Sequence, residues 1–212
     1  MKKSIIKLMP IGGQAENGKS MYCLEIDDNW FIIDAGYRFP EVDKLGVDVI
    51  IPNFDYLKDN KDKIKAIFIT HGHDDVMGAL PYLLQEVNVP IYTTDLTADL
   101  IDQLLQRYMR HSHVSYKYKI KRVNMNATIK VAGVEVDFFP ITHSIPGSVG
   151  LAFLTDYGYI VYSSEFIIDF GAPERFRCNI QKMMEIGKKG VLALLVNHHI
   201  QKTMAILLLI IS

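Results

Sequence analysis

Short apolar runs separated by turn residues predict a strand-rich first part of the chain. Runs at residues 4–11, 20–26 and 30–36 are rich in Ile, Tyr and Phe, and Asp27-Asp28-Asn29 supplies a turn between the second and the third. The runs at residues 48–53 and 65–70 have the same character and are also expected to be strands.

Two segments in the middle of the chain show helical spacing. Residues 78–87 place leucines and a valine three and four positions apart, and Pro81 is tolerated in a first helical turn. Residues 94–109 form the clearest predicted helix, which Thr94 or Asp95 can cap. Its apolar face is expected to comprise Leu96, Leu100, Ile101, Leu104, Leu105 and Tyr108.

The second half of the chain is again rich in β-like runs. Strands are predicted at 89–94, 118–123, 128–133, 134–142, 149–155, 158–164 and 191–196, with a short helix at 180–190. Strands mixed with helices in this order indicate a layered sheet-and-helix domain of the α/β class.

Composition narrows the class of protein further. The chain has 212 residues and a formal net charge of −1, so no global basic field indicates nucleic-acid binding. Cys23 and Cys178 form neither a CxxC pair nor a disulfide framework, which favours the cytoplasm. The first apolar run breaks at Pro10 and Gly12, too early for a signal peptide.

The last residues differ from the rest. Met204 to Ile211 are all apolar, but a membrane-spanning helix needs about 20 such residues, so no membrane anchor is expected. A buried strand and an abnormal tail both remain open interpretations.

Candidate metal chemistry lies where predicted strands end. His71 and His73 stand two apart after the strand at 65–70, so in extended backbone both imidazoles face one side. Asp75 follows them, and His143 and Glu165 follow two later strands. Imidazoles beside carboxylates suit zinc, with manganese as an alternative. Each of these residues taken alone also has an ordinary structural interpretation.

A local basic stretch at residues 106–122 interleaves arginines and lysines with three tyrosines. Cations suit phosphates and aromatic rings suit unstacked bases. The competing interpretation is a solvated helix end followed by an edge strand. Both interpretations rest on Arg107, Arg110, Lys117, Lys119, Lys121, Arg122, Tyr108, Tyr116 and Tyr118.

Five stretches in order resemble the ribonuclease J branch of the metallo-β-lactamase superfamily. They are PIGGQAENGKSMY, FIIDAGYRFPEVDKLGVDVIIPNFDYL, FITHGHDDVMGALPYLL, ITHSIPGSVG and IVYSSEF. The resemblance implies a metallo-β-lactamase-like αββα sandwich over residues 1–195, followed by an atypical tail at 196–212. Compared with that family, we expect the fold to be incomplete here, without the family's C-terminal part and its inserted β-CASP domain.

The resemblance also implies a function and roles for particular residues. It implies metal-dependent hydrolysis of RNA, with His71, His73 and His143 on a first metal. Asp75 matches a second-metal ligand and catalytic proton handler, and Glu165 matches a bridging carboxylate. Ser144 and Ser148 are implied as substrate-binding residues, and Asp34 as a buried acid behind the ligands.

Three positions depart from the family pattern. Val76 replaces a second-metal histidine, Glu165 stands where an aspartate is usual, and Gly147 replaces a loop carboxylate. We therefore expect one zinc ion at most and impaired activity. The alternatives are a non-catalytic partner of a full-length ribonuclease J paralogue, with self-association as another mode, and a truncated product without function. The tail suggests a shifted reading frame.

Overall fold

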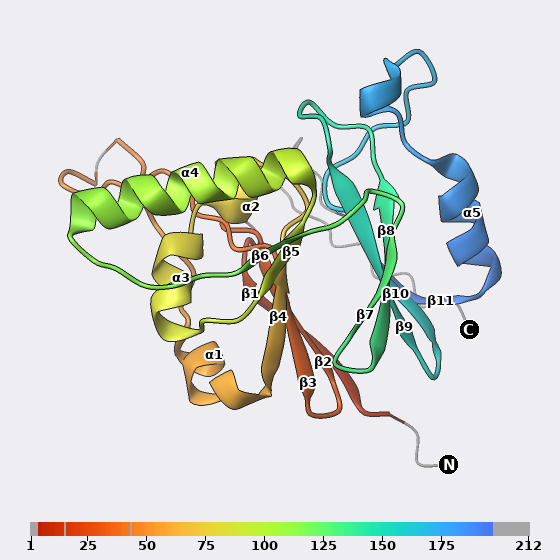
Figure 1. Cartoon of the computed structure of the whole chain (residues 1–212), viewed down its shortest axis with the longest axis horizontal. Coiled ribbons are helices and arrows are strands. Elements are labelled where there is room, and N and C mark those ends of the chain that lie inside the picture. The colour runs from red at the N-terminus through yellow and green to blue at the C-terminus, as the bar shows by residue number, and fades with distance from the viewer. Residues whose placement is uncertain (1–3, 15, 43, 197–212) are drawn as a thin grey trace.

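Two β-sheets pack face to face, and helices cover the outer face of each, as Figure 1 shows. The structure is a computed structural model that describes residues 4–14, 16–42 and 44–196. The predicted αββα sandwich is confirmed in these residues. Of the predicted tail only Val196 is described.

The first sheet has the strand order β1-β2-β3-β4-β5-β6. Neighbours from β1 to β3 are antiparallel, and neighbours from β3 to β6 are parallel. The strands are β1 (Ile6–Gly12), β2 (Met21–Ile26), β3 (Asn29–Ile33), β4 (Ile64–Phe68), β5 (Ile91–Thr93) and β6 (Ile120–Arg122).

The second sheet has the order β11-β10-β9-β8-β7, and only its β10–β11 pair is parallel. Its strands are β7 (Thr128–Val131), β8 (Val134–Pro140), β9 (Val149–Thr155), β10 (Gly158–Tyr162) and β11 (Val191–Leu195).

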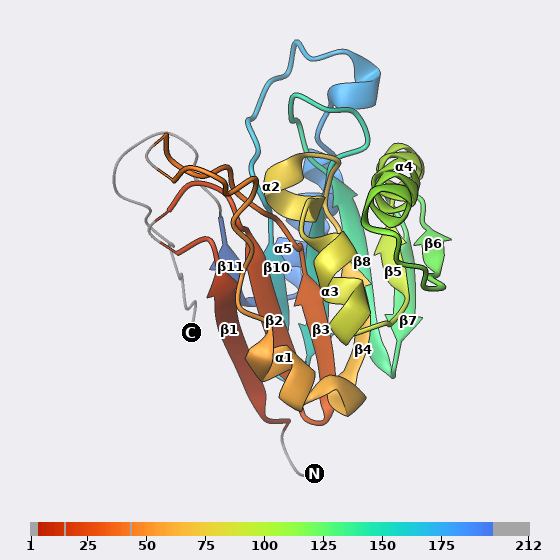
Figure 2. The same ribbon diagram turned by 90° about the vertical axis from the view of Figure 1, so that its left-hand side faces the viewer.

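Helices α1 to α4 lie on the outer face of the first sheet, in front of it in Figure 2, and α5 lies on the second sheet. Among the described residues no helix is long and apolar enough to cross a membrane. The helices are α1 (Asp55–Asp59), α2 (Asp74–Met77), α3 (Leu80–Glu86), α4 (Asp95–Ser112) and α5 (Ile180–Lys188).

Strand alternation decides which side chains enter which layer. In β3, Trp30 and Ile32 pack under the helices, whereas Phe31 and Ile33 enter the space between the sheets. There Phe31 meets Phe153 of the opposite sheet, with ring centroids 5.7 Å apart. The inter-sheet core therefore fixes the distance between the strand ends that carry the candidate ligands.

Residues 48–53 were predicted as a strand, and this prediction is wrong. Only Ile50 pairs, in a single antiparallel bridge with Arg38. A run of Ile and Val is insufficient here because the rest of the segment has no neighbouring strand to bond. The segment belongs instead to the long loop that joins β3 to α1.

Candidate metal centre

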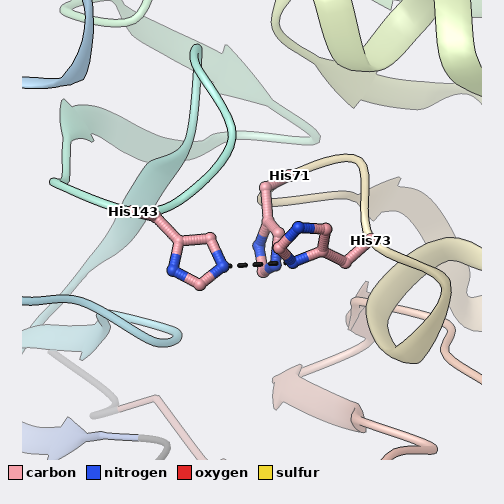
Figure 3. Close-up of side chains that lie close together, drawn as sticks. All are labelled: His71, His73 and His143. Carbon is pink, nitrogen blue, oxygen red and sulfur yellow. Dashed lines mark hydrogen bonds between the residues drawn. The ribbon is translucent and has the colours of Figure 1, made fainter.

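Three imidazole rings converge at one edge of the sandwich, as Figure 3 shows. His71, His73 and His143 each offer a ring nitrogen, and these nitrogens lie within 4.8 Å of one another. His143 Nε2 is 3.1 Å from His73 Nδ1. Nitrogens that share a tetrahedral zinc at its usual bond length lie about 3.3 Å apart. The three rings are therefore close to the arrangement that a single ion requires.

The sequence places the two paired candidate ligands through local geometry. His71 follows the end of β4, and Gly72 separates it from His73, whose extended backbone (φ −85°, ψ 152°) caps α2. A Cβ on Gly72 would lie 2.3 Å from Leu100 Cδ1. Glycine therefore lets this turn run directly against α4.

Helix α2 has only four residues, and backbone bonds to the loop after β3 hold it. Ala35 N–H donates to the Val76 carbonyl at 2.7 Å, and Tyr37 N–H donates to that of Asp74 at 3.1 Å. A Cβ on Gly36 would lie 1.5 Å from the Asp75 carbonyl oxygen. Only glycine permits this approach, so Gly36 helps to set the position of the ligand turn.

The loop that follows β8 brings in His143. Thr94, predicted as a possible cap, is the N-cap residue of α4, but its hydroxyl makes no capping bond and donates to the Gly147 carbonyl at 2.7 Å. Gly147 has a φ of +78°, a conformation that favours glycine. Thr94 therefore ties the start of α4 to the His143 loop.

A buried hydrogen-bond chain supports His71 from behind. Thr70 Oγ1 lies 3.0 Å from His71 Nδ1, and it also lies 3.0 Å from Asp34 Oδ1. With Asp34 ionised, the Thr70 hydroxyl donates to the carboxylate and accepts from His71 Nδ1–H. The lone pair of His71 then lies on Nε2, which points into the triad. Such outer partners orient metal-binding histidines.

Asp34 itself is fully buried, as the resemblance implied for this acid. The Thr70 N–H and the Tyr162 hydroxyl each donate to it at 2.9 Å. Burial, with a smaller contribution from the charge of Asp75, raises the pKa of Asp34 to about 7 despite these donors. No cation neighbours this carboxylate among the described ion pairs.

The buried nitrogen of His71 is the clearest indication that these side chains suit a metal ion. His71 is completely buried, and its Nε2 has no hydrogen-bond partner among the described residues. Burial and the neighbouring His143 and His73 lower the pKa of His71 to about 2, so the ring stays neutral. An unpaired buried polar atom is costly, whereas neutral imidazole nitrogens are good metal ligands. The residues present therefore fit a divalent metal.

The predicted carboxylates lie near the triad but are not members of the described metal-competent group. Asp75 is half-buried in α2. Glu165 lies just after β10, where a bridge between Thr142 and Ile167 holds its segment beside the residue before His143. Val76 is completely buried and offers no ligand atom.

The two predicted serines have different surroundings. Ser144 is exposed, and its hydroxyl lies 3.4 Å from His73 Nε2. Ser148 is buried, and its hydroxyl donates to the Ile145 carbonyl at 2.8 Å. Ser144 is therefore exposed beside His73, whereas Ser148 bonds within the loop that carries His143.

The tyrosines of the basic stretch are part of the fold. Tyr116 donates to the Pro81 carbonyl at 3.1 Å, and Tyr118 donates to Asp102 at 2.6 Å. Arg122 pairs with Asp99, and Lys121 donates to the Tyr92 hydroxyl at 2.8 Å. For these residues, the structure therefore supports a helix end followed by an edge strand rather than a surface for RNA bases.

Sequence reasoning missed Thr70 and Tyr162 as supports of the centre. Thr70 directly precedes the first ligand, so its position was a usable signal. Tyr162 lies 128 positions from Asp34 in the chain, and no local pattern connects the two.

Comparison with known proteins places these features in a family. Residues 16–159 match the model of the metallo-β-lactamase superfamily. The chain is 42% identical over 194 residues to ribonuclease J 2 of Staphylococcus saprophyticus and 40% identical over 194 residues to that of Staphylococcus aureus. It is 43% identical over 191 residues to that of Streptococcus pyogenes. These alignments cover 90–92% of this chain but 34% of each relative, so the chain spans about a third of their length.

Solved structures share the fold at low sequence identity. A protein of unknown function from Enterococcus faecalis V583 gives a TM-score of 0.65 at 18% identity, covering 90% of this chain and 49% of that one. Unliganded yeast PDE1 gives 0.63 at 12% identity, covering 91% and 75%. Zn(2+)-bound PqqB from Methylobacterium extorquens gives 0.56 at 13% identity, covering 89% and 71%.

Proposed function

We propose that this chain, which belongs to the metallo-β-lactamase superfamily and within it to the ribonuclease J family, holds one zinc ion and hydrolyses RNA slowly in the cytoplasm. His71, His73 and His143 would hold the ion through His71 Nε2, His73 Nδ1 and His143 Nε2. The observation that carries this proposal is the buried His71 Nε2 within the converging triad, which has no hydrogen-bond partner in the part of the chain that the structure describes.

Three protein nitrogens and an open fourth position are a known catalytic arrangement for zinc. A divalent ion there would supply a nucleophile by lowering the pKa of water and would polarise phosphoryl oxygens. Thr70 and Asp34 hold the His71 ring in orientation. Asp75, two residues after His73, is the candidate proton acceptor, and the exposed Ser144 is the candidate donor to a substrate oxygen.

Slow turnover is part of the proposal. Two-metal sites clamp both the attacking and the leaving oxygen of a phosphodiester. Here Val76 offers hydrocarbon where the family pattern has a ligand, so a second ion could use only Asp75 and Glu165. We expect that second ion to bind weakly, with manganese as the alternative to zinc.

Metal analysis tests the proposal directly. Protein purified without added metal should contain about one zinc per chain by plasma mass spectrometry, and His143→Ala should lose it. Lys130→Gln, an exposed substitution in β7, is the matched control and should retain it. A stoichiometry near zero in the unaltered chain, together with no binding on zinc titration, would refute the metal centre.

Cleavage is the second measurement. A 5′-labelled RNA should be cut slowly by the unaltered chain, and a chelator should stop the reaction. Val76→His with Glu165→Asp should increase the rate if the altered signature limits turnover. No increase, although the repaired chain binds a second metal ion, would contradict that limitation.

A partner role is the second candidate, because Val76, which is fully buried, stands where the family pattern has a ligand. In that case the chain would bind RNA or an active ribonuclease J paralogue without cutting RNA itself. Co-expression with a full-length ribonuclease J distinguishes the two. A stable complex that cuts RNA, formed by a chain that does not cut alone, favours the partner role.

A further inference from the structure

A hollow between α2 and α4 begins one residue after the ligand His73. Its volume is about 320 Å³, and Asp74 and Met77 of α2 form one wall. Leu100, Leu104, Arg107 and Arg110 of α4 form the other. Figures 1 and 2 both place α2 beside α4. The hollow and the metal-binding turn share a wall, because Leu100 touches Gly72 between His71 and His73.

The hollow combines an apolar floor with a cationic rim. Met77 and Leu104 are largely buried and supply hydrocarbon, whereas Arg107 and Arg110 are exposed and stand one helical turn apart. Neither guanidinium forms an ion pair or hydrogen bond with another residue that the structure describes. By contrast, Arg122 in the same basic stretch is already paired with Asp99.

One carboxylate also lines the hollow. Asp74 shares a hydrogen bond with the Tyr37 hydroxyl, and the charge of Arg107 is close enough to act on that same tyrosine. The hollow is lined by two guanidinium groups and one carboxylate, so its rim carries a net positive charge. Gln103 adds an uncharged amide to the same rim.

We propose that this hollow binds one nucleotide of single-stranded RNA beside the metal centre. Arg107 and Arg110 contact its phosphate, and Met77, Leu100 and Leu104 receive the face of its base. The proposal deepens the proposed function, since it takes RNA as the substrate. Guanidinium groups bind phosphate through two parallel hydrogen bonds, and a base taken out of its stack packs between aromatic or apolar side chains. A strand held here would enter the metal centre past Gly72.

Binding in a chelator tests this separately from catalysis, because no cleavage takes place without metal. Fluorescence anisotropy would compare the unaltered chain, Arg107→Gln/Arg110→Gln and the control Lys130→Gln/Lys188→Gln, using a labelled single-stranded oligoribonucleotide. The control removes the same charge from exposed sites on the second sheet and α5. The arginine variant should bind about tenfold more weakly, and its salt slope should fall by about 0.7, because the contact with one phosphate is lost. Equal losses in both variants would overturn the site.

Two further ligands test the nature of the occupant. If a base occupies the apolar floor, an abasic strand of the same length should bind at least about threefold more weakly than RNA. Equal binding would overturn the nucleotide assignment. Polyglutamate of matched charge should compete poorly, and equal competition would indicate an acidic protein segment instead. A chain that binds RNA through the arginines but contains no zinc would refute the proposed function and leave this site standing.

Discussion

Asp34 and Asp137 are both almost completely buried, yet their pKa values move in opposite directions. Each accepts hydrogen bonds from a threonine and from a tyrosine hydroxyl. Burial raises the pKa of Asp34 to about 7. Burial also acts upward on Asp137, but Lys182 Nζ at 2.6 Å, together with Thr128 and Tyr159, outweighs it and lowers the pKa.

The difference shows what each carboxylate does. Asp137, in β8, holds Lys182 of α5 and so fastens that helix to the second sheet. Among the residues that the structure describes, Asp34 has only neutral donors, and Thr70 connects it to His71 of the triad. One carboxylate has its cation within the protein. We infer that the other gains its balancing charge when metal binds to the triad.

The largest expected effect is the stabilisation by zinc, which a change near Asp34 should abolish and a change near Asp137 should not. Zinc at about one hundred times its dissociation constant should stabilise the unaltered chain by about 2.7 kcal/mol. His143→Ala should abolish this gain, because it removes one of three ligands, whereas Lys182→Met should keep it. Thermal unfolding with and without zinc measures both. An equal gain in His143→Ala would place the zinc elsewhere.

Breaking the ion pair should make Asp137 resemble Asp34. Lys182→Met leaves a buried carboxylate with hydroxyl donors alone, and we expect a loss of about 2 kcal/mol, since Lys182 is partly exposed. Asp137→Asn/Lys182→Met should lose less than the single lysine change, because no unpaired charge remains. Urea unfolding of both variants checks this, and additive losses would show that the two groups do not interact.

Two matched threonine substitutions, one beside each aspartate, show which aspartate affects zinc binding. Thr70→Val removes the hydroxyl between Asp34 and His71, so zinc affinity should fall about tenfold, equivalent to about 1.4 kcal/mol. Thr128→Val removes the equivalent hydroxyl beside Asp137 and should leave zinc affinity unchanged. Isothermal titration provides both values. If both variants bind zinc as the unaltered chain does, Thr70 has no role in orienting His71.

Acid stability gives the smallest expected effect. A lowered pKa means that Asp137 stabilises the fold above its unfolded pKa and loses this contribution as pH falls. The raised pKa of Asp34 has the opposite sign, since its contribution is complete below the unfolded pKa and is lost as pH rises. Between about pH 5 and pH 3, metal-free Asp137→Asn should therefore lose less stability than the unaltered chain, and Asp34→Asn should lose more. Parallel curves would contradict the two assignments.

Much of the secondary structure was predictable, because apolar periodicity depends on local burial. The helix at 94–109 and the strands at 128–133 and 149–155 all formed, within a few residues of the predicted bounds. The predicted strand at 48–53 did not form, because strand pairing needs a neighbour that local pattern does not reveal. Leu96, predicted on the buried face of α4, stands in the first turn of that helix and is 39% exposed.

The candidate site was also predictable in part from the sequence. The spacing of His71 and His73 placed both rings on one side, and His143 joined them as expected from its place after a strand. The tyrosines at 116 and 118 could not be assigned from composition, because a ring beside basic residues suits either a base or a core. Their hydroxyl bonds to Pro81 and Asp102 decided for the core.

The sequence by itself predicted most of the strands along the chain, the three histidines that meet in the triad and the hydrocarbon side chain at position 76. These properties depend on residue type and on spacing of a few positions. Only the tertiary structure decided that Asp34 supports His71 through Thr70, and that Asp137 is paired with Lys182. Those contacts join residues 36 and 45 positions apart, and they exist only where packed strands and helices bring them together.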